Sequence, residues 1–210
     1  MTRIAAPQIT HSRLRYVLPL LLLGTLPLLQ GCVGIAVGAG AAAGVAAAEE
    51  RGAKNAANDK GIQLAINERL FQKDLSLFGK VSVTVYEGRV LLTGVVQKQA
   101  DRDEAERIAW EQGRAVEVIN ELVIAPSGNL IDSANDTWIT SQLRFKLTGD
   151  SSVVDINYSI DTVNGTIYLL GLAQSEAELL RVTDHARTIQ GVRRVVSHVL
   201  LKTDSRRRPV

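Results

Sequence analysis

The feature that most constrains the fold of this chain is an internal repeat, which appears when the sequence is shifted by 77 residues without a gap. Self-similarity at a fixed spacing indicates a duplicated structural unit. The sequence therefore predicts two domains of one design at residues 59–124 and 136–201, joined by a linker at 125–135. The identical pairs include Asn58 and Asn135, Asp59 and Asp136, Ile62 and Ile139, Leu70 and Leu147, Gly88 and Gly165, Leu92 and Leu169, Gly94 and Gly171, Gln97 and Gln174, Ala100 and Ala177, Ala109 and Ala186, and Val118 and Val195.

The second repeat opens with a predicted amphipathic helix at 135–148. Ile139, Leu143 and Leu147 recur at every fourth position, which is typical of a helix that buries one face. Asp136 is expected to be the N-cap, because its side-chain oxygen can accept hydrogen bonds from the free amides of the first turn.

Each repeat is then predicted to continue as strand, strand, helix, strand. Apolar residues alternate in the first strand, and the turn after it is Asn164-Gly165 in the second copy, the favoured pair for a type I′ hairpin. Glu87-Gly88 is the weaker counterpart in the first copy. The strand after the turn, 89–96 or 166–173, is apolar on both faces, so it is expected at the centre of the sheet.

The second helix and the last strand complete each predicted domain. Ser175 and Glu178 are spaced as a capping box at the start of that helix. The last strand is expected at 117–124 in the first copy and 194–201 in the second. The predicted fold is therefore α+β: two tandem αββαβ domains, each a three-stranded mixed sheet with two helices on one face.

Residues 1–31 have the features of a secretory signal peptide. Three arginines precede an apolar stretch at 17–29, which is too short to span a bilayer. The tetrapeptide Leu29-Gln30-Gly31-Cys32 follows and resembles the bacterial lipobox, in which the signal is cut before the cysteine and the cysteine is acylated, for example with palmitate. Cys32 is the only cysteine of the chain. The alternative is an ordinary signal peptide followed by a coincidental free thiol.

Two further segments lie outside the predicted domains. Residues 32–58 are expected to be a tether, because the run at 33–48 consists largely of glycine and alanine. A packed helical element is the alternative, since small residues recur there at helix-packing spacing. Residues 202–210 form a basic tail that is expected to be solvated, and contact of Arg206 to Arg208 with phosphates is the alternative.

The helix at 135–148 also carries an aromatic pair beside its buried stripe. Trp138 and Phe145 fall together at about 100 to 120° from that stripe, next to Arg144 and Lys146. A surface that is both apolar and cationic suits a phospholipid interface. In the first copy the two aromatic positions hold a glycine and a glutamate, so the fold itself does not need them. The alternative is that the pair fills the junction between the two domains.

Composition and side-chain patterns argue against several other functions. A net charge of only +2 disfavours a general nucleic-acid binder. The acids Asp101, Asp103, Glu104 and Glu106 are expected at the start of a helix, where its dipole favours them, so no metal is predicted. His185 and His198 accompany no nucleophile or paired carboxylates, and the sequence therefore predicts neither an enzyme nor a cofactor.

The repeats resemble BON domains, small modules associated with phospholipid binding in the bacterial envelope. The likeness is carried by the αββαβ order, the Gly88 to Gly94 and Gly165 to Gly171 spacing, and the run from Gly191 to Val195. The first copy departs from this pattern, because Arg114-Ala115 stands where Gly-Val is usual.

The resemblance implies a periplasm-facing outer-membrane lipoprotein that binds anionic phospholipid through the first helix of its second BON domain. It also implies that the protein supports envelope integrity and is enriched at division sites. Val33 and Gly34 fit sorting to the outer membrane, because neither is the aspartate that typically retains lipoproteins at the inner membrane. The expected lipid-binding residues are Trp138, Thr137, Ser141, Arg144 and Phe145, with a phosphatidylglycerol-like lipid as partner and Cys32 as the anchor. The alternative function is a non-catalytic adaptor for outer-membrane assembly or cell-wall remodelling proteins.

Overall fold

A computed structural model of the chain describes residues 49–125 and 133–207. The predicted signal peptide, Cys32 and the glycine- and alanine-rich run all lie outside these residues, as does most of the predicted linker. Among the helices that the structure describes, none is long and apolar enough to cross a membrane.

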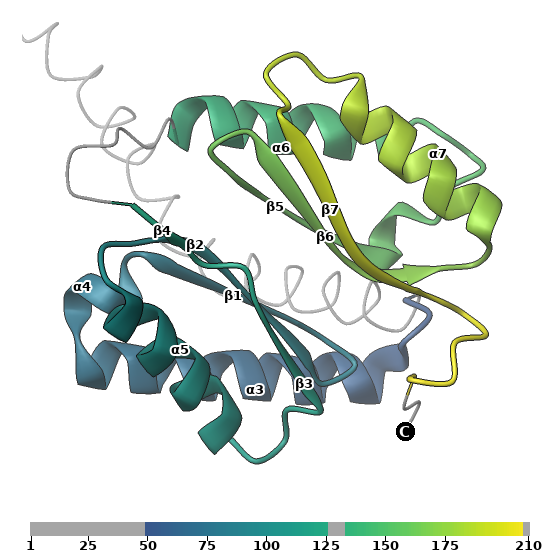
Figure 1. Ribbon diagram of the computed structural model, residues 1–210. Helices are drawn as coiled ribbons and strands as arrows, with labels where there is room; N and C mark the ends of the chain where they lie inside the picture. The colour runs from purple at the N-terminus through teal and green to yellow at the C-terminus, as the bar shows by residue number, and fades with distance from the viewer. Residues whose placement is uncertain (1–48, 126–132, 208–210) are drawn as a thin grey trace, which may run out of the picture. The chain divides into compact units, whose positions relative to one another are not determined.

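Both repeats fold in the predicted order (Figure 1). The first consists of α3 (Gly52–Lys73), α4 (Leu75–Phe78), β1 (Val81–Tyr86), β2 (Arg89–Val96), α5 (Gln99–Glu111), β3 (Glu117–Asn120) and β4 (Val123–Ile124). The second consists of α6 (Ser133–Thr148), a short 3-10 helix (Asp155–Asn157), β5 (Tyr158–Val163), β6 (Thr166–Ala173), α7 (Glu176–Arg187) and β7 (Arg194–Leu201).

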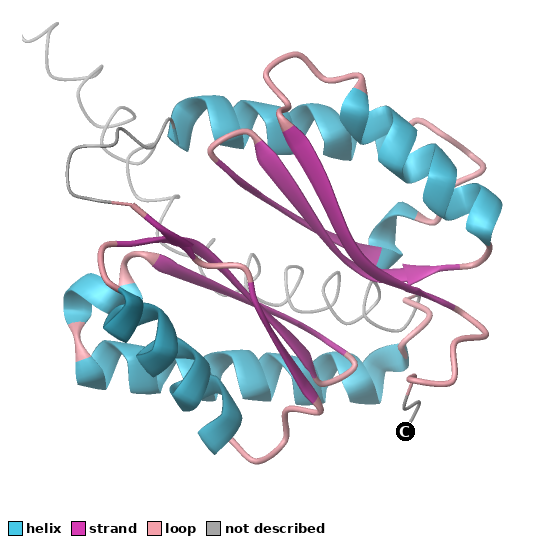
Figure 2. Ribbon diagram, viewed as in Figure 1, coloured by secondary structure: helices cyan, strands magenta, loops and turns pink. Residues whose placement is uncertain are grey.

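The two sheets are mixed, as predicted, and the strand after the hairpin is central in each. β2 pairs antiparallel with β1 and parallel with β3 and β4, and β6 pairs antiparallel with β5 and parallel with β7. Helices α3 and α5, with the short α4, cover one face of the first sheet, and α6 and α7 cover one face of the second (Figure 2). The predicted fold class of two tandem αββαβ units is confirmed.

The uncovered faces of the two sheets share a third apolar cluster. Tyr86, Leu91 and Val95 of the first repeat belong to it, together with Tyr168 and Leu170 of the second. This cluster explains why β2 and β6 are apolar on both sides: one side packs under helices and the other against the neighbouring repeat. Polar contacts between the repeats accompany it, including Arg89 Nη1 donating to the His198 carbonyl at 2.6 Å. Arg207 Nη2 also donates to Glu87 Oε1 at 2.7 Å with both side chains largely buried, so the prediction that the basic tail is solvated is wrong at this residue.

The hairpin turns have the predicted conformation, but the aspartate before them has a different role from the one expected. Asn164 and Gly165 have φ of 49° and 72°, as a type I′ turn requires. α6 begins at Ser133, so the prediction that Asp136 is its N-cap is wrong. Asp136 is buried, and its carboxylate accepts hydrogen bonds from the Asn164 and Gly165 amides, each at 2.7 Å.

The first repeat has the same contact, and its first helix begins earlier than the sequence predicts. Asp59 accepts from the Glu87 and Gly88 amides, each at 2.8 Å. Residues 52–58, which the sequence placed in the tether, belong to α3, and Arg51 directly precedes this helix. The Arg51 guanidinium donates to Asp59 Oδ2 at 2.9 Å and to the Val85 carbonyl at 3.1 Å.

The last strand differs between the copies. β7 is continuous, as predicted, whereas the predicted strand 117–124 is interrupted between β3 and β4. The Asn120 side chain explains the interruption, because its Oδ1 accepts from the Leu122 amide at 3.2 Å and its Nδ2 donates to Glu106 at 2.8 Å. Both short strands still pair in parallel with β2.

Candidate functional site

Helix α6 is fixed by its buried stripe. Ile139, Leu143 and Leu147 are at most 1% exposed and belong to the core between the helices and the sheet of the second repeat. The Asp136 carboxylate ties the first turn of the helix to the β5–β6 hairpin. The other side of α6 therefore faces outward on a rigid support.

Trp138 and Phe145 lie on that outward side. Trp138 is 44% exposed and Phe145 is 79% exposed, although both are large and apolar. The apolar cluster that joins the repeats is built from other residues, such as Tyr86, Tyr168 and Leu170. The indole of Trp138 is therefore not enclosed between the repeats.

The polar members of the expected set are exposed as well. The Thr137 hydroxyl donates to the Ser133 carbonyl at 2.7 Å, and the Ser141 hydroxyl donates to the Thr137 carbonyl at 2.8 Å. Arg144 is exposed and donates from Nη1 to the Tyr158 carbonyl at 3.0 Å, which ties its guanidinium to the start of β5. The structure thus brings Trp138, Thr137, Ser141, Arg144 and Phe145 onto one side of α6.

A groove of about 570 Å³ adjoins this face of α6. Thr137, Thr140 and Ser141 line one side, and Gly79 and Lys80 of the first repeat line the other. Its two acids are already engaged, Asp136 by the hairpin amides and Asp161 by Thr93 and by the Thr162 amide.

A second set of exposed apolar side chains was missed by the sequence analysis. Leu64 and Phe71 on α3 are 59% and 56% exposed, and Leu75 and Phe78 on α4 are 66% and 38% exposed. Leu64 and Phe71 are seven residues apart, so a helical wheel of α3 places them together, opposite Ile62 and Ile66. That spacing was the signal available in the sequence.

Charged groups elsewhere have structural partners. His185 Nε2 lies 2.8 Å from Asp150 Oδ2, and this hydrogen bond holds the pKa of the Asp150 carboxyl below its usual value. His198 Nε2 lies 2.9 Å from Glu121 Oε1. Neither pair adjoins a third group of a catalytic triad among the contacts of the described residues.

The acids at the start of α5 are likewise engaged with neighbouring side chains. Hydrogen bonds from Arg107 and Lys73 lower the pKa of Glu104 to about 2. Asp103 accepts from Gln99 at 2.6 Å, and Glu106 accepts from Asn120 at 2.8 Å. Within residues 49–125 and 133–207, no group of three or more histidine, cysteine or acidic residues is arranged to hold a metal ion.

Comparison with known proteins identifies the class to which this fold and surface belong. The model of the BON domain matches the chain twice, at residues 58–126 and 135–203, and the chain therefore belongs to the BON domain family.

Similarity to individual proteins extends over most of the chain. It is 32% identical over 179 residues to the outer membrane lipoprotein DolP of Haemophilus influenzae, which covers 84% of this chain and 91% of that protein. This similarity and the two BON domains make it a dual-BON, DolP-like protein. It is also 40% identical over 152 residues to an uncharacterized protein of Anaplasma centrale, covering 72% and 99%, and 27% identical over 150 residues to the osmotically-inducible protein Y of Escherichia coli, covering 70% and 75%.

Proposed function

We propose that this protein is an envelope lipoprotein that binds anionic phospholipid through the outward face of α6. The observation that carries the proposal is the exposure of Trp138 and Phe145 on a helix whose opposite side is locked in a core. The first repeat has Gly61 and Glu68 at the matching positions and keeps the same fold, so stability does not account for the aromatic pair.

The energetics fit a contact that is weak alone and effective when tethered. Insertion of two aromatic side chains supplies about 2 to 4 kcal/mol. Arg144 and Lys146 each add roughly 1 kcal/mol on an anionic surface. Together these correspond to millimolar to micromolar affinity. An acyl chain on Cys32 would confine the protein to the membrane, and the contact of α6 would then be intramolecular.

The relatives support the proposed location. The DolP relative is by name an outer membrane lipoprotein. We therefore place this protein at the outer membrane, facing the periplasm and anchored through Cys32, in a supporting and non-catalytic role in the envelope. Enrichment at division sites and binding of envelope proteins stay predictions from the family resemblance.

The direct test is vesicle co-sedimentation of residues 33–210 carrying Trp138→Glu. This fragment keeps every helix and strand described above and lacks only the signal peptide and the acylation site. We expect binding to phosphatidylglycerol vesicles to fall at least tenfold, because the substitution removes the indole and adds a charge that the anionic surface repels.

The matched control is Leu180→Glu. Leu180 is 61% exposed on α7, so this variant introduces the same charge at another exposed apolar position. It should bind nearly as well as the unchanged fragment, and both variants should keep their circular dichroism spectra. Undiminished binding by the Trp138 variant would refute the assignment of α6.

A further inference from the structure

The first repeat has an exposed apolar surface of its own, which we call the α3–α4 corner: Leu64, Phe71, Leu75 and Phe78. The Phe71 and Phe78 rings meet edge to face with their centroids 5.6 Å apart. Three of these four side chains are more than half exposed. Large apolar side chains gathered on an exposed surface indicate an interaction site.

Buried residues on the inner sides of α3 and α4 keep the side chains of the α3–α4 corner on the outer side. Ile62, Ile66 and Leu70 fix the inner side of α3 in the core, which leaves Leu64 and Phe71 on the outer side. Leu77 fixes α4 in the same way. The start of α4 is capped by Asp74, whose carboxylate accepts from the Ser76 amide at 2.6 Å and from the Leu77 amide at 3.4 Å.

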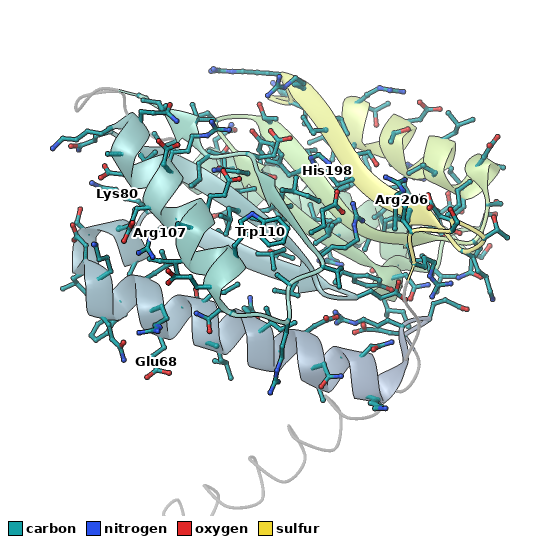
Figure 3. The ribbon with its side chains drawn as sticks, turned by 60° about the horizontal axis from the view of Figure 1, so that its bottom comes forward. Glu68, Lys80, Arg107, Trp110, His198 and Arg206 are labelled. Carbon is teal, nitrogen blue, oxygen red and sulfur yellow. The ribbon has the colours of Figure 1, made fainter. Side chains whose placement is uncertain are left out.

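The second repeat shows that the fold does not require these side chains. Under the 77-residue shift, the four positions hold Ser141, Thr148, Ser152 and Asp155, all of them polar. The aromatic pair of α6 has the opposite distribution, because its matching positions in the first repeat are Gly61 and Glu68. Glu68 points away from the sheet on the outer side of α3 (Figure 3). Each repeat therefore displays a different apolar set on one scaffold.

The surroundings of the corner favour a bilayer as its occupant. Gly79 and Lys80 directly follow Phe78, and they line the groove whose other side is Thr137 and Ser141 of α6. The residues that directly follow the corner thus lie across this groove from α6. From residue 67 to residue 80 the chain has three cations, Arg69, Lys73 and Lys80, and two anions, Glu68 and Asp74, which gives a net charge of +1. Such a charge suits an anionic surface.

We propose that the α3–α4 corner is a second membrane-inserting element, which enters the headgroup region of the same anionic bilayer that α6 contacts. The inference rests on the proposed function of α6. Two insertion points separated by a groove fix the tilt of the protein on the membrane, whereas one helix alone leaves it free to rotate about that contact.

The test gives two exposed members of the corner the residues that the second repeat has at the matching positions, Thr148 and Ser152, as Phe71→Thr with Leu75→Ser in residues 33–210. We expect binding to phosphatidylglycerol vesicles to weaken about tenfold, because two apolar side chains no longer enter the interface. Leu180→Ser is the matched control and should bind unchanged. Binding within twofold of the unchanged fragment would overturn the inference.

A second measurement reports insertion directly, so it does not depend on interpreting a loss of binding that misfolding could also cause. Cys32 is the only cysteine, so Leu75→Cys in residues 33–210 gives a single site for an environment-sensitive fluorophore. The label should shift to the blue on addition of these vesicles, while the same label at Leu180→Cys should not. An unshifted label on vesicle-bound protein, or a change in sedimentation that shows the corner joining two copies of the chain, would reject the proposal.

The outcomes separate the two proposals. If Trp138→Glu weakens binding and the corner variant does not, only the second insertion point fails. If Trp138→Glu leaves binding unchanged, the function proposed for α6 fails, whatever the corner variant shows.

Discussion

Among single residues, a buried aspartate joins the first helix of each repeat to its hairpin. Asp59 and Asp136 are 3% and 5% exposed, and each accepts two hydrogen bonds from amides of the turn. A carboxylate that receives two buried amides satisfies donors that have no other partner in a tight turn. Asp136 thereby sets the position of α6, and with it the direction in which Trp138 points.

Replacing Asp136 with alanine should therefore destabilise the second repeat. The Asn164 and Gly165 amides would lose their acceptor, at a cost of about 2 to 4 kcal/mol. Urea denaturation should show a lower midpoint, and Asp136→Asn should be intermediate because the amide oxygen can still accept one hydrogen bond. A midpoint equal to that of the unchanged protein would contradict the role given to this carboxylate.

Individual site residues could be predicted where position on a helix determines exposure. The helical wheel placed Trp138 and Phe145 outside the buried stripe, and both are exposed. The role of Asp136 was mistaken because N-cap and turn contacts use the same chemistry, and the sequence does not show which amides are near. Gly171 was recognised only by its spacing; a Cβ there would lie 2.0 Å from the Asn157 carbonyl oxygen.

For whole helices and strands, strong periodicity predicted the type and order correctly. The boundaries were less accurate, because α3 begins at Gly52, before the predicted start, and Arg51 at this end contacts Asp59 within the helix and the Val85 carbonyl of β1. The interruption between β3 and β4 depends likewise on the side chain of Asn120. Such contacts leave no local pattern.

The α3–α4 corner escaped prediction for a different reason. Positions 61 and 68 of the first repeat match the aromatic pair of α6, and neither holds an aromatic residue. Its exposed apolar residues lie at other positions, and α4 is only four residues long, too short for a periodic signal. Exposure measured in the structure was needed to find them.

In the whole molecule, the two repeats share a core that the sequence did not reveal. Apolar residues on both faces placed β2 and β6 at the centre of their sheets, but the pattern does not identify what covers the second face. The structure shows that the repeats cover each other, with Tyr168, Leu170 and Leu172 at most 1% exposed.

Each repeat alone should consequently be less stable than the intact chain or self-associate. A fragment of residues 133–210 would expose Tyr168, Leu170 and Leu172 to water, so we expect it to self-associate or to unfold at lower urea concentration than the intact chain. Analytical ultracentrifugation and urea denaturation of this fragment, alone and mixed with residues 49–125, would measure this. Two monomeric fragments, each as stable as the intact chain, would show that the shared cluster contributes little.

The central claim is that the outward face of α6 enters the bilayer, and the fluorescence of Trp138 tests it most directly. The chain has two tryptophans, and Trp110 is 48% exposed on α5, so Trp110→Phe leaves Trp138 as the only indole in residues 33–210. On phosphatidylglycerol vesicles containing brominated lipid, the emission should shift to the blue and be quenched, most strongly by bromine near the headgroup. Emission that stays unshifted and unquenched while the protein sediments with the vesicles would contradict the claim.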